Sequence, residues 1–331
     1  MTANTQLIRL RQLAKDLHLG VALYRLYYAP KGYIEKLLRW GLINTVLTNR
    51  GRLKMEKAVS SLKPIELELS NNFPNSPEIY FLTGKKYWYQ TCFCAYSMIQ
   101  QSQINLRPVI YDDGTLEQKH KEEIIRIFPS AKIVSLQTIE ARLDKYLPES
   151  KFPVLRERRL KQPLLRKLTD FHVGSQGWKL FLDSDMLFFQ SPKFLLEWLN
   201  YPHKPCYMMD VKNAYGYSND LMVYLSGNQI PELVNIGILG FKSEDIDWQK
   251  LELWLKTMLE KEGTHYNVTQ GLSAMLLAGK PCAISPAEEY LLMPEREEAL
   301  KPQAIMHHYV ADSKPWYFRY GWRHVLRSSK C

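Results

Sequence analysis

From residue 79 onwards, short apolar runs alternate with longer stretches in which apolar residues recur every three to four positions. The runs have the length of buried strands, and the longer stretches have the period of helices that cover a sheet. Predicted strands lie at 79–83, 107–111, 131–136, 178–182, 205–210, 234–241 and 304–310, and predicted helices at 89–101, 116–127, 155–171, 191–199, 248–260 and 267–277. Strands joined by crossover helices imply an α/β fold with a mostly parallel central sheet, whose ligands bind at the carboxyl ends of the strands.

The first 62 residues differ in character from the rest of the chain. Apolar residues alternate there with Lys and Arg in a broadly helical pattern, and residues 1–66 carry twelve basic and four acidic side chains, most of the net charge of +10. Such a segment either lies in a membrane interface or packs its apolar stripe on the main domain, and the sequence leaves both open. We predict a basic amphipathic helical extension at 1–62, a linker at 63–77 and one α/β domain at 78–331.

Several classes of protein are not expected from this sequence. No apolar run is long enough to span a membrane, and the polar N-terminus, interrupted by Arg and Lys, is not that of a secretory signal peptide. Five cysteines without a paired metal-binding spacing agree with a reducing compartment. No dinucleotide-binding, Walker or nucleic-acid-binding motif occurs. We expect a cytoplasmic protein, with peripheral attachment to the inner membrane face as an option that the basic extension leaves open.

The predicted strand at 178–182 ends in two carboxylates, Asp183 and Asp185, and an apolar run resumes at 186–189. Burying an unpaired carboxylate is costly, so these acids lie at an open strand end or are neutralised by a cation. Mg²⁺ and Mn²⁺ prefer carboxylate oxygens and keep positions for the phosphates of a nucleotide. The alternative is an ordinary strand-to-turn junction with solvated acids, because an isolated Asp-x-Asp is a weak motif.

Basic and imidazole groups occur on either side of these acids in the sequence. The predicted helix at 155–171 carries six basic residues, His308 lies in the late strand, and Lys314 follows it. Together, the acids and His308 could hold a cation while ammonium groups neutralise a leaving phosphate, as a metal-bound diphosphate requires. Taken singly, each has a structural explanation: His308 as a satisfied core residue and Lys314 as a solvated charge.

These residues resemble the motifs of the GT-A-fold nucleotide-sugar glycosyltransferases, and most of all those of family 8, which includes glycogenin and bacterial galactosyltransferases. In that family a strand ends in Asp-x-Asp, matched by Asp183-Ser184-Asp185, and a late segment matched by residues 308–316 supplies a third metal ligand and a diphosphate-binding lysine. The spacing is kept, although Ala311 replaces the usual Gly. The resemblance covers roughly residues 78–320. It implies a Rossmann-like sheet, a UDP-sugar donor, and Mn²⁺ or Mg²⁺ held by Asp183, Asp185 and His308.

Weaker matches follow the same order along the chain. The family's first strand ends in a Thr, with a Tyr four residues on that packs on the nucleobase, because a base offers an apolar face. A basic residue near the phosphates is matched by Lys167, with Arg166 in reserve, and an Asn-x-Gly strand hydrogen-bonds the donor sugar. The donor-binding set that the resemblance implies is Leu82, Thr83, Tyr87, Lys167, Ser184, Asn235, Gly237 and Lys314.

One departure from the family bears on the mechanism. Family members have Asp-Gln opening a helix beside the anomeric carbon, whereas this chain has Thr269-Gln270. The family retains anomeric configuration, and a chain without this acid cannot use it as a nucleophile. Front-face displacement, in which the leaving phosphate helps to deprotonate the acceptor, needs no such acid. We predict Gln270 as the catalytic residue, with Asp210 as the next candidate.

The function predicted from the sequence is a metal-dependent hexosyltransferase that moves a sugar from a nucleotide diphosphate sugar to a carbohydrate or lipid-linked acceptor. A haloacid-dehalogenase-like phosphatase also ends a strand in Asp-x-Asp, but it has Thr or Val where this chain has Leu187. A non-catalytic, membrane-associated protein on a degenerate transferase fold is favoured by the positive charge and the missing acid. Release of free nucleotide from a nucleotide sugar in the presence of Mn²⁺ separates the enzyme from this alternative.

Overall fold

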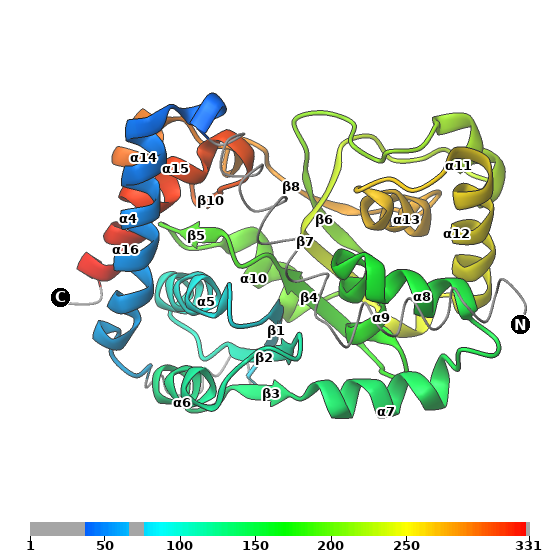
Figure 1. The fold of residues 1–331 in the computed structure, drawn as a ribbon, viewed down its shortest axis with the longest axis horizontal. Helices are drawn as coiled ribbons and strands as arrows, with labels where there is room; N and C mark the ends of the chain where they lie inside the picture. The colour runs from blue at the N-terminus through cyan, green and yellow to red at the C-terminus, as the bar shows by residue number, and fades with distance from the viewer. Residues whose placement is uncertain (1–36, 66–75, 329–331) are drawn as a thin grey trace, which may run out of the picture.

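The computed structural model describes residues 37–65 and 76–328, which include a seven-stranded sheet (Figure 1). Its strands, in spatial order, are β3 (Lys132–Val134), β2 (Arg107–Asp112), β1 (Glu78–Thr83), β4 (Trp178–Leu182), β7 (Val234–Lys242), β6 (Cys206–Met209) and β8 (Ala283–Ser285). Only β7 runs antiparallel to its neighbours, β4 and β6. The prediction of a mostly parallel sheet is therefore confirmed.

Helices cover both faces of this sheet, as predicted. Alternate residues of β1 enter different cores: Ile79 and Phe81 belong to one apolar cluster and Tyr80 to the other. The first cluster receives side chains from α5 (Trp88–Ser102), α6 (Gln118–Ile127) and α10 (Lys193–Asn200). The second receives them from α7 (Leu136–Tyr146), α8 (Pro153–Lys161), α9 (Arg166–His172), α11 (Asn219–Ser226), α12 (Trp248–Glu262) and α13 (Val268–Leu277).

A smaller three-stranded sheet joins the middle of the chain to its late part. It consists of β5 (Met186–Phe188), β10 (Met306–His308) and β9 (Tyr290–Leu292). In the antiparallel pair of β5 and β10, His308 lies opposite Met186. This pairing brings a residue from the late part of the chain next to the Asp-x-Asp segment.

Three of the predicted secondary-structure assignments are wrong, each for a physical reason that the structure shows. The strand predicted at 131–136 ends at Val134, because the Ser135 side chain accepts a hydrogen bond from Thr138 N and caps α7. No helix was predicted between the strands at 205–210 and 234–241, but that segment contains α11, capped in the same way by Ser218. The basic helix predicted at 155–171 is broken at Pro163 by a 3₁₀ turn, because proline cannot supply the N–H that a continuous helix needs.

The described part of the N-terminal extension packs on the main domain. α4 (Leu42–Ala58) is followed by a 3₁₀ turn (Val59–Ser61), and Met55, Val59 and Leu62 are buried in the first core. Figure 1 shows α4 along one edge of the molecule, beside α15 (Lys314–Trp316) and α16 (Trp322–Ser328). The predicted helices between residues 1 and 36 lie outside the described residues. No described helix is long and apolar enough to cross a membrane.

Candidate functional site

A cleft of about 670 Å³ opens at the carboxyl ends of β1 and β4 and the amino end of antiparallel β7. Backbone pairing continues past β4, where Asp183 N donates to Gly237 O at 2.8 Å. The cleft is lined by all the residues predicted from the sequence except Asp210: Leu82, Thr83, Tyr87, Lys167, Asp183, Ser184, Asp185, Asn235, Gly237, Gln270, His308 and Lys314. The fold thus gathers into one cavity residues that are more than 200 positions apart.

Asp183, Asp185 and His308 form a compact carboxylate–histidine cluster at the floor of this cleft. One ligand atom from each residue lies within 4.8 Å of the others. His308 Nε2 is 3.1 Å from Asp185 Oδ1 and 3.8 Å from Asp183 Oδ2. The pairing of β5 with β10 fixes this geometry, and Tyr309 N donates to Asp185 O at 2.9 Å. Two hard carboxylates and one imidazole fit a Mn²⁺ or Mg²⁺ ion.

Two lysines neutralise the carboxylates of this cluster. Lys167 Nζ lies 2.6 Å from Asp183 Oδ1, and Lys314 Nζ forms an ion pair with Asp185. Burial alone would raise the pKa of Asp185, but the charges of Lys314 and His308 outweigh burial and lower the pKa below its usual value. Asp185 is therefore ionised at neutral pH and ready to bind a cation.

The break between α8 and α9 aims Lys167 into the cleft. Asp170 is fully buried and receives Arg159 Nε at 2.6 Å and Arg166 Nε at 2.7 Å. The guanidinium of Arg166 is thus occupied by Asp170 and by Asp113 O, to which it also donates a hydrogen bond. The next residue, Lys167, extends to Asp183 instead. The structure thus places the predicted phosphate-binding Lys167, and not its reserve Arg166, against the cluster.

Gly237 allows His308 to lie where it does. A Cβ atom added to Gly237 would approach His308 Cε1 to 2.4 Å and Met186 Cε to 2.7 Å, well inside van der Waals contact. The Nδ1 atom of His308 is buried and has no hydrogen-bond partner among the described residues, and Nε2 faces the carboxylates. A glycine at this position is consequently part of the cluster's geometry.

A second polar group lies around Asp210 at the other side of Gly237. Asp210 Oδ2 accepts hydrogen bonds from Gln270 Nε2 at 3.0 Å and from Asn235 Nδ2 at 2.9 Å, and Asn235 Oδ1 accepts from Gly237 N at 2.8 Å. The amide nitrogen of Gln270 is therefore fixed on Asp210. Its carbonyl oxygen has no hydrogen-bond donor among the described residues. Asp210 itself stands behind the cleft wall and also accepts from Val211 N.

The far end of the cleft offers an aromatic surface. Tyr87 is 41% exposed at the start of α5, and Thr83 Oγ1 accepts a hydrogen bond from Thr91 Oγ1 at 2.9 Å. Tyr266, which is 80% exposed, and Asp113 line the same cavity but were not predicted. Asp113 could have been found, since it directly follows β2 and so lies at a carboxyl strand end. Tyr266 lies in a loop, where the sequence gives no comparable signal.

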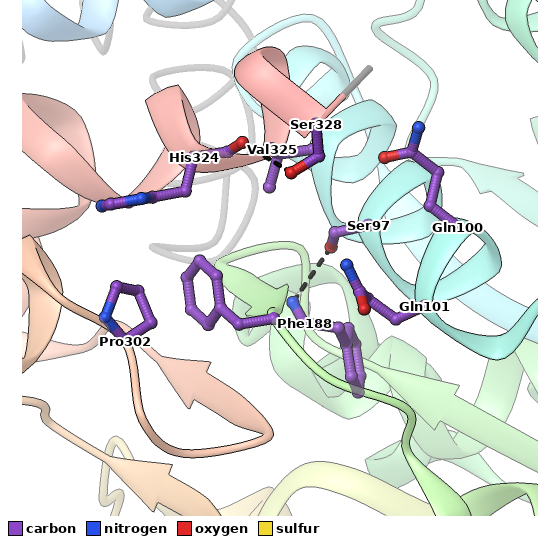
Figure 2. Close-up of a pocket in the computed structure, with 9 residues that line it drawn as sticks. Ser97, Gln100, Gln101, Phe188, Pro302, His324, Val325 and Ser328 are labelled. Atoms are coloured by element: carbon purple, nitrogen blue, oxygen red, sulfur yellow. Dashed lines mark hydrogen bonds between the residues drawn. The ribbon is translucent and has the colours of Figure 1, made fainter. Parts of the chain in front are cut away.

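A separate cavity of about 200 Å³ lies between α5 and α16 (Figure 2). Ser97 Oγ accepts a hydrogen bond from Phe188 N at 3.0 Å there, and Ser328 Oγ donates to His324 O. None of the described residues that line this cavity is acidic. Ser97 thus holds β5 against α5, and the hydrogen bond of Ser328 stays within α16. The candidate chemistry therefore belongs to the larger cleft.

Comparison with solved structures supports the fold assignment. The galactosyltransferase LgtC, solved in complex with donor and acceptor sugar analogues, matches 76% of this chain and 95% of its own with a TM-score of 0.51 at 14% sequence identity. Mouse xyloside xylosyltransferase 1, without ligand, matches 72% and 99% of the two chains with a TM-score of 0.49 at 9% identity. No family model and no curated protein matches the sequence. The chain has the GT-A transferase fold, as the motifs predicted.

Proposed function

We propose that this protein is a metal-dependent glycosyltransferase that moves a sugar from a nucleotide diphosphate sugar, with UDP as the nucleotide, to a carbohydrate or lipid-linked acceptor. One observation carries the proposal: Asp183, Asp185 and His308 converge in a cleft that also holds Lys167 and Lys314. Two half-buried acids between two lysines suit a ligand that brings both a cation and a diphosphate. The GT-A fold agrees with this activity but does not by itself establish it.

The charge balance of the cleft explains how donor binding would proceed. The carboxylate–histidine cluster would hold Mn²⁺ or Mg²⁺, and the ion would neutralise charge on the diphosphate. Without donor, Lys167 and Lys314 form ion pairs with the two carboxylates. When the donor binds, each lysine would exchange its carboxylate partner for a phosphate oxygen. Both lysines then stabilise the negative charge that develops on the leaving nucleotide.

The amide side chains around Asp210 are the groups that would contact the donor sugar. Gln270 and Asn235 line the cleft with their nitrogens anchored on Asp210, so Gln270 presents its carbonyl oxygen toward a bound sugar. That oxygen can stabilise the positive charge that builds on the anomeric carbon. Asp210 accepts three hydrogen bonds within 3.0 Å, so both of its carboxylate oxygens are engaged by neighbouring protein groups. We assign it the role of positioning the two amides.

The chain lacks an acid at position 269, and this shapes the proposed mechanism. Thr269 is buried, with its hydroxyl unpartnered among the described residues. Retention of configuration would then proceed by displacement on the same face, where the leaving phosphate takes the proton of the acceptor hydroxyl. No side-chain nucleophile is needed for this route, so Gln270 acts by electrostatics.

A donor screen tests the proposal. Purified protein is heated with each of a panel of nucleotide sugars, with and without Mn²⁺, because binding to the folded state alone raises the Tm. We expect a UDP-sugar to raise the Tm only with Mn²⁺ present, and free UDP to be released on incubation. Stabilisation without any nucleotide release would favour the non-catalytic alternative. No stabilisation by any nucleotide sugar would contradict the proposal.

A further inference from the structure

The inner face of α4 is formed by small residues together with Met55, and not by its leucines and isoleucine. The buried residues of the helix are Thr45, Thr48, Gly51 and Met55. At Gly51, an added Cβ would come within 2.1 Å of the carbonyl oxygen of Phe318, so the helix touches the neighbouring backbone directly. An approach this close excludes larger side chains from the contact. The aliphatic residues of α4 are therefore left outside it.

These aliphatic residues form an exposed row with basic residues between them. We call the outer face of α4 the set Leu42, Ile43, Leu47, Arg50, Leu53, Lys54 and Lys57. Ile43 is 74% exposed, Leu42 65% and Leu53 49%. Positions 43, 47, 50, 54 and 57 follow helical spacing, so they lie on one side of the helix. A face that combines exposed aliphatic and basic residues, with no acidic residue, offers both apolar area and positive charge to an anionic lipid surface.

A basic hollow of about 370 Å³ continues this face toward the C-terminal helix. Lys54 of α4 lines it together with Trp322, Arg323, Leu326 and Arg327 of α16. Arg323 lies 5.7 Å from the centre of the Trp322 ring. In the described part of the chain, no acidic side chain pairs with any of the three cations. Three unneutralised cations around an apolar floor fit a phosphate group attached to an apolar tail.

We propose that the outer face of α4 and the basic hollow together form a docking surface for an anionic phospholipid bilayer. The aliphatic residues enter the interfacial layer, and Lys54, Arg323 and Arg327 contact lipid phosphates. Docking would also orient the cleft, because α4 and the residues just before it are bonded to the segment around Lys314: Arg39 pairs with Asp312, and Arg319 donates to Asn44 Oδ1 at 2.6 Å. The surface requires no donor or acceptor sugar and is independent of the proposed reaction.

Vesicle flotation of the full chain tests the docking surface. The protein is mixed with vesicles of phosphatidylcholine alone or with added phosphatidylglycerol, at low and high salt. We expect binding to the anionic vesicles only, and weaker binding at high salt because salt screens the charges. Equal binding to both kinds of vesicle, or binding to neither, would overturn the proposal.

A pair of matched variants assigns the binding to this face. Lys54→Glu/Arg327→Glu should lower the vesicle partition coefficient at least about 20-fold, since each basic residue at the surface contributes about fivefold. Arg323 is left unchanged because it stacks on Trp322. The control, Lys250→Glu/Lys256→Glu, makes the same charge change on exposed positions of α12, at the opposite edge of the molecule (Figure 1). An equal loss in both variants would show that net charge alone is responsible and would refute the assignment.

The aliphatic residues are tested separately with Ile43→Ser/Leu47→Ser. We expect this variant to lose anionic vesicle binding while its Tm stays close to that of the wild type, because both side chains are exposed. Sedimentation velocity without vesicles examines another occupant of the face. If the wild type is a dimer and this variant a monomer, the face binds a second copy of the chain and the membrane assignment is wrong.

Discussion

Replacing Gly237 by Ala should separate cation binding from folding. The backbone at Gly237 is not in the left-handed region, so Ala meets no conformational penalty there. Its Cβ, however, would lie 2.4 Å from His308 Cε1, whereas ordinary contact begins near 3.4 Å. The imidazole must retreat by about 1 Å, or β7 must shift by as much. Overpacking of this kind costs about 1 to 3 kcal/mol of stability.

The same displacement should weaken the carboxylate–histidine cluster. His308 Nε2 now lies 3.1 Å from Asp185 Oδ1, and a metal ligand must keep its distance from the ion to within about 0.2 Å, so a displacement of about 1 Å spoils the position of the imidazole as a ligand. Misplacement of a metal ligand typically reduces metal affinity or activity about 10- to 100-fold. Calorimetric titration of Mn²⁺ in the presence of UDP measures the Mn²⁺ affinity of each variant, and a thermal melt measures its folding stability.

Gly240→Ala is the matched control for this prediction. Gly240 lies on the same strand, and a Cβ there would come within 2.5 Å of Cys206 Sγ and of the Trp198 ring, far from the cluster. We expect both variants to have a lower Tm but only Gly237→Ala to lose Mn²⁺ affinity. If the two variants lose Mn²⁺ affinity equally, or if Gly237→Ala binds Mn²⁺ as the wild type does, the inferred link between Gly237 and His308 is refuted.

Three further predictions concern the charge, the amide and a buried histidine. Asp185→Ala should abolish Mn²⁺-dependent donor binding and lower the rate about 10³-fold or more, with full activity in this variant counting against a metal-dependent reaction. Gln270→Ala should lower kcat roughly 10- to 1000-fold with little change in donor affinity; a silent substitution would place the catalytic face elsewhere. Burial lowers the pKa of His172 to about 3, so the unfolded chain binds the extra proton and stability falls as the pH drops below about 6.5. Urea unfolding at neutral and acidic pH should show a smaller decrease in His172→Gln than in the wild type.

The strands of the main sheet were predictable because each one is a short apolar run between polar segments. β1, β2, β4 and β7 begin and end within one residue of their predicted limits. The direction of β7 was not predictable, since the sequence gives no pairing partner for a strand. The caps Ser135 and Ser218 that begin the missed helices were visible in the sequence, but serine is equally common in loops.

The candidate site shows a different limit of sequence reasoning. Asp183 and Asp185 attracted attention because two acids interrupt an apolar run, a local signal. Their approach to His308 depends on the pairing of β5 with β10, and only the family resemblance suggested it in advance. In α4, the sequence suggested that an apolar stripe could face the domain, whereas the structure buries Thr45, Thr48 and Gly51 there beside Met55. Small residues that permit close backbone contact leave no hydrophobic pattern to read.

The central claim is that one cleft binds a nucleotide diphosphate through a divalent cation. Calorimetric titration of UDP into the wild-type protein, with Mn²⁺ and then with excess chelator, tests it directly, and Asp183→Asn/Asp185→Asn serves as the matched variant because it keeps the side-chain shapes and removes both charges. We predict saturable binding of one UDP per chain in the wild type with Mn²⁺, and loss of binding with chelator or in the variant. UDP binding of equal affinity in all three cases, or no binding with Mn²⁺ present, would contradict the account.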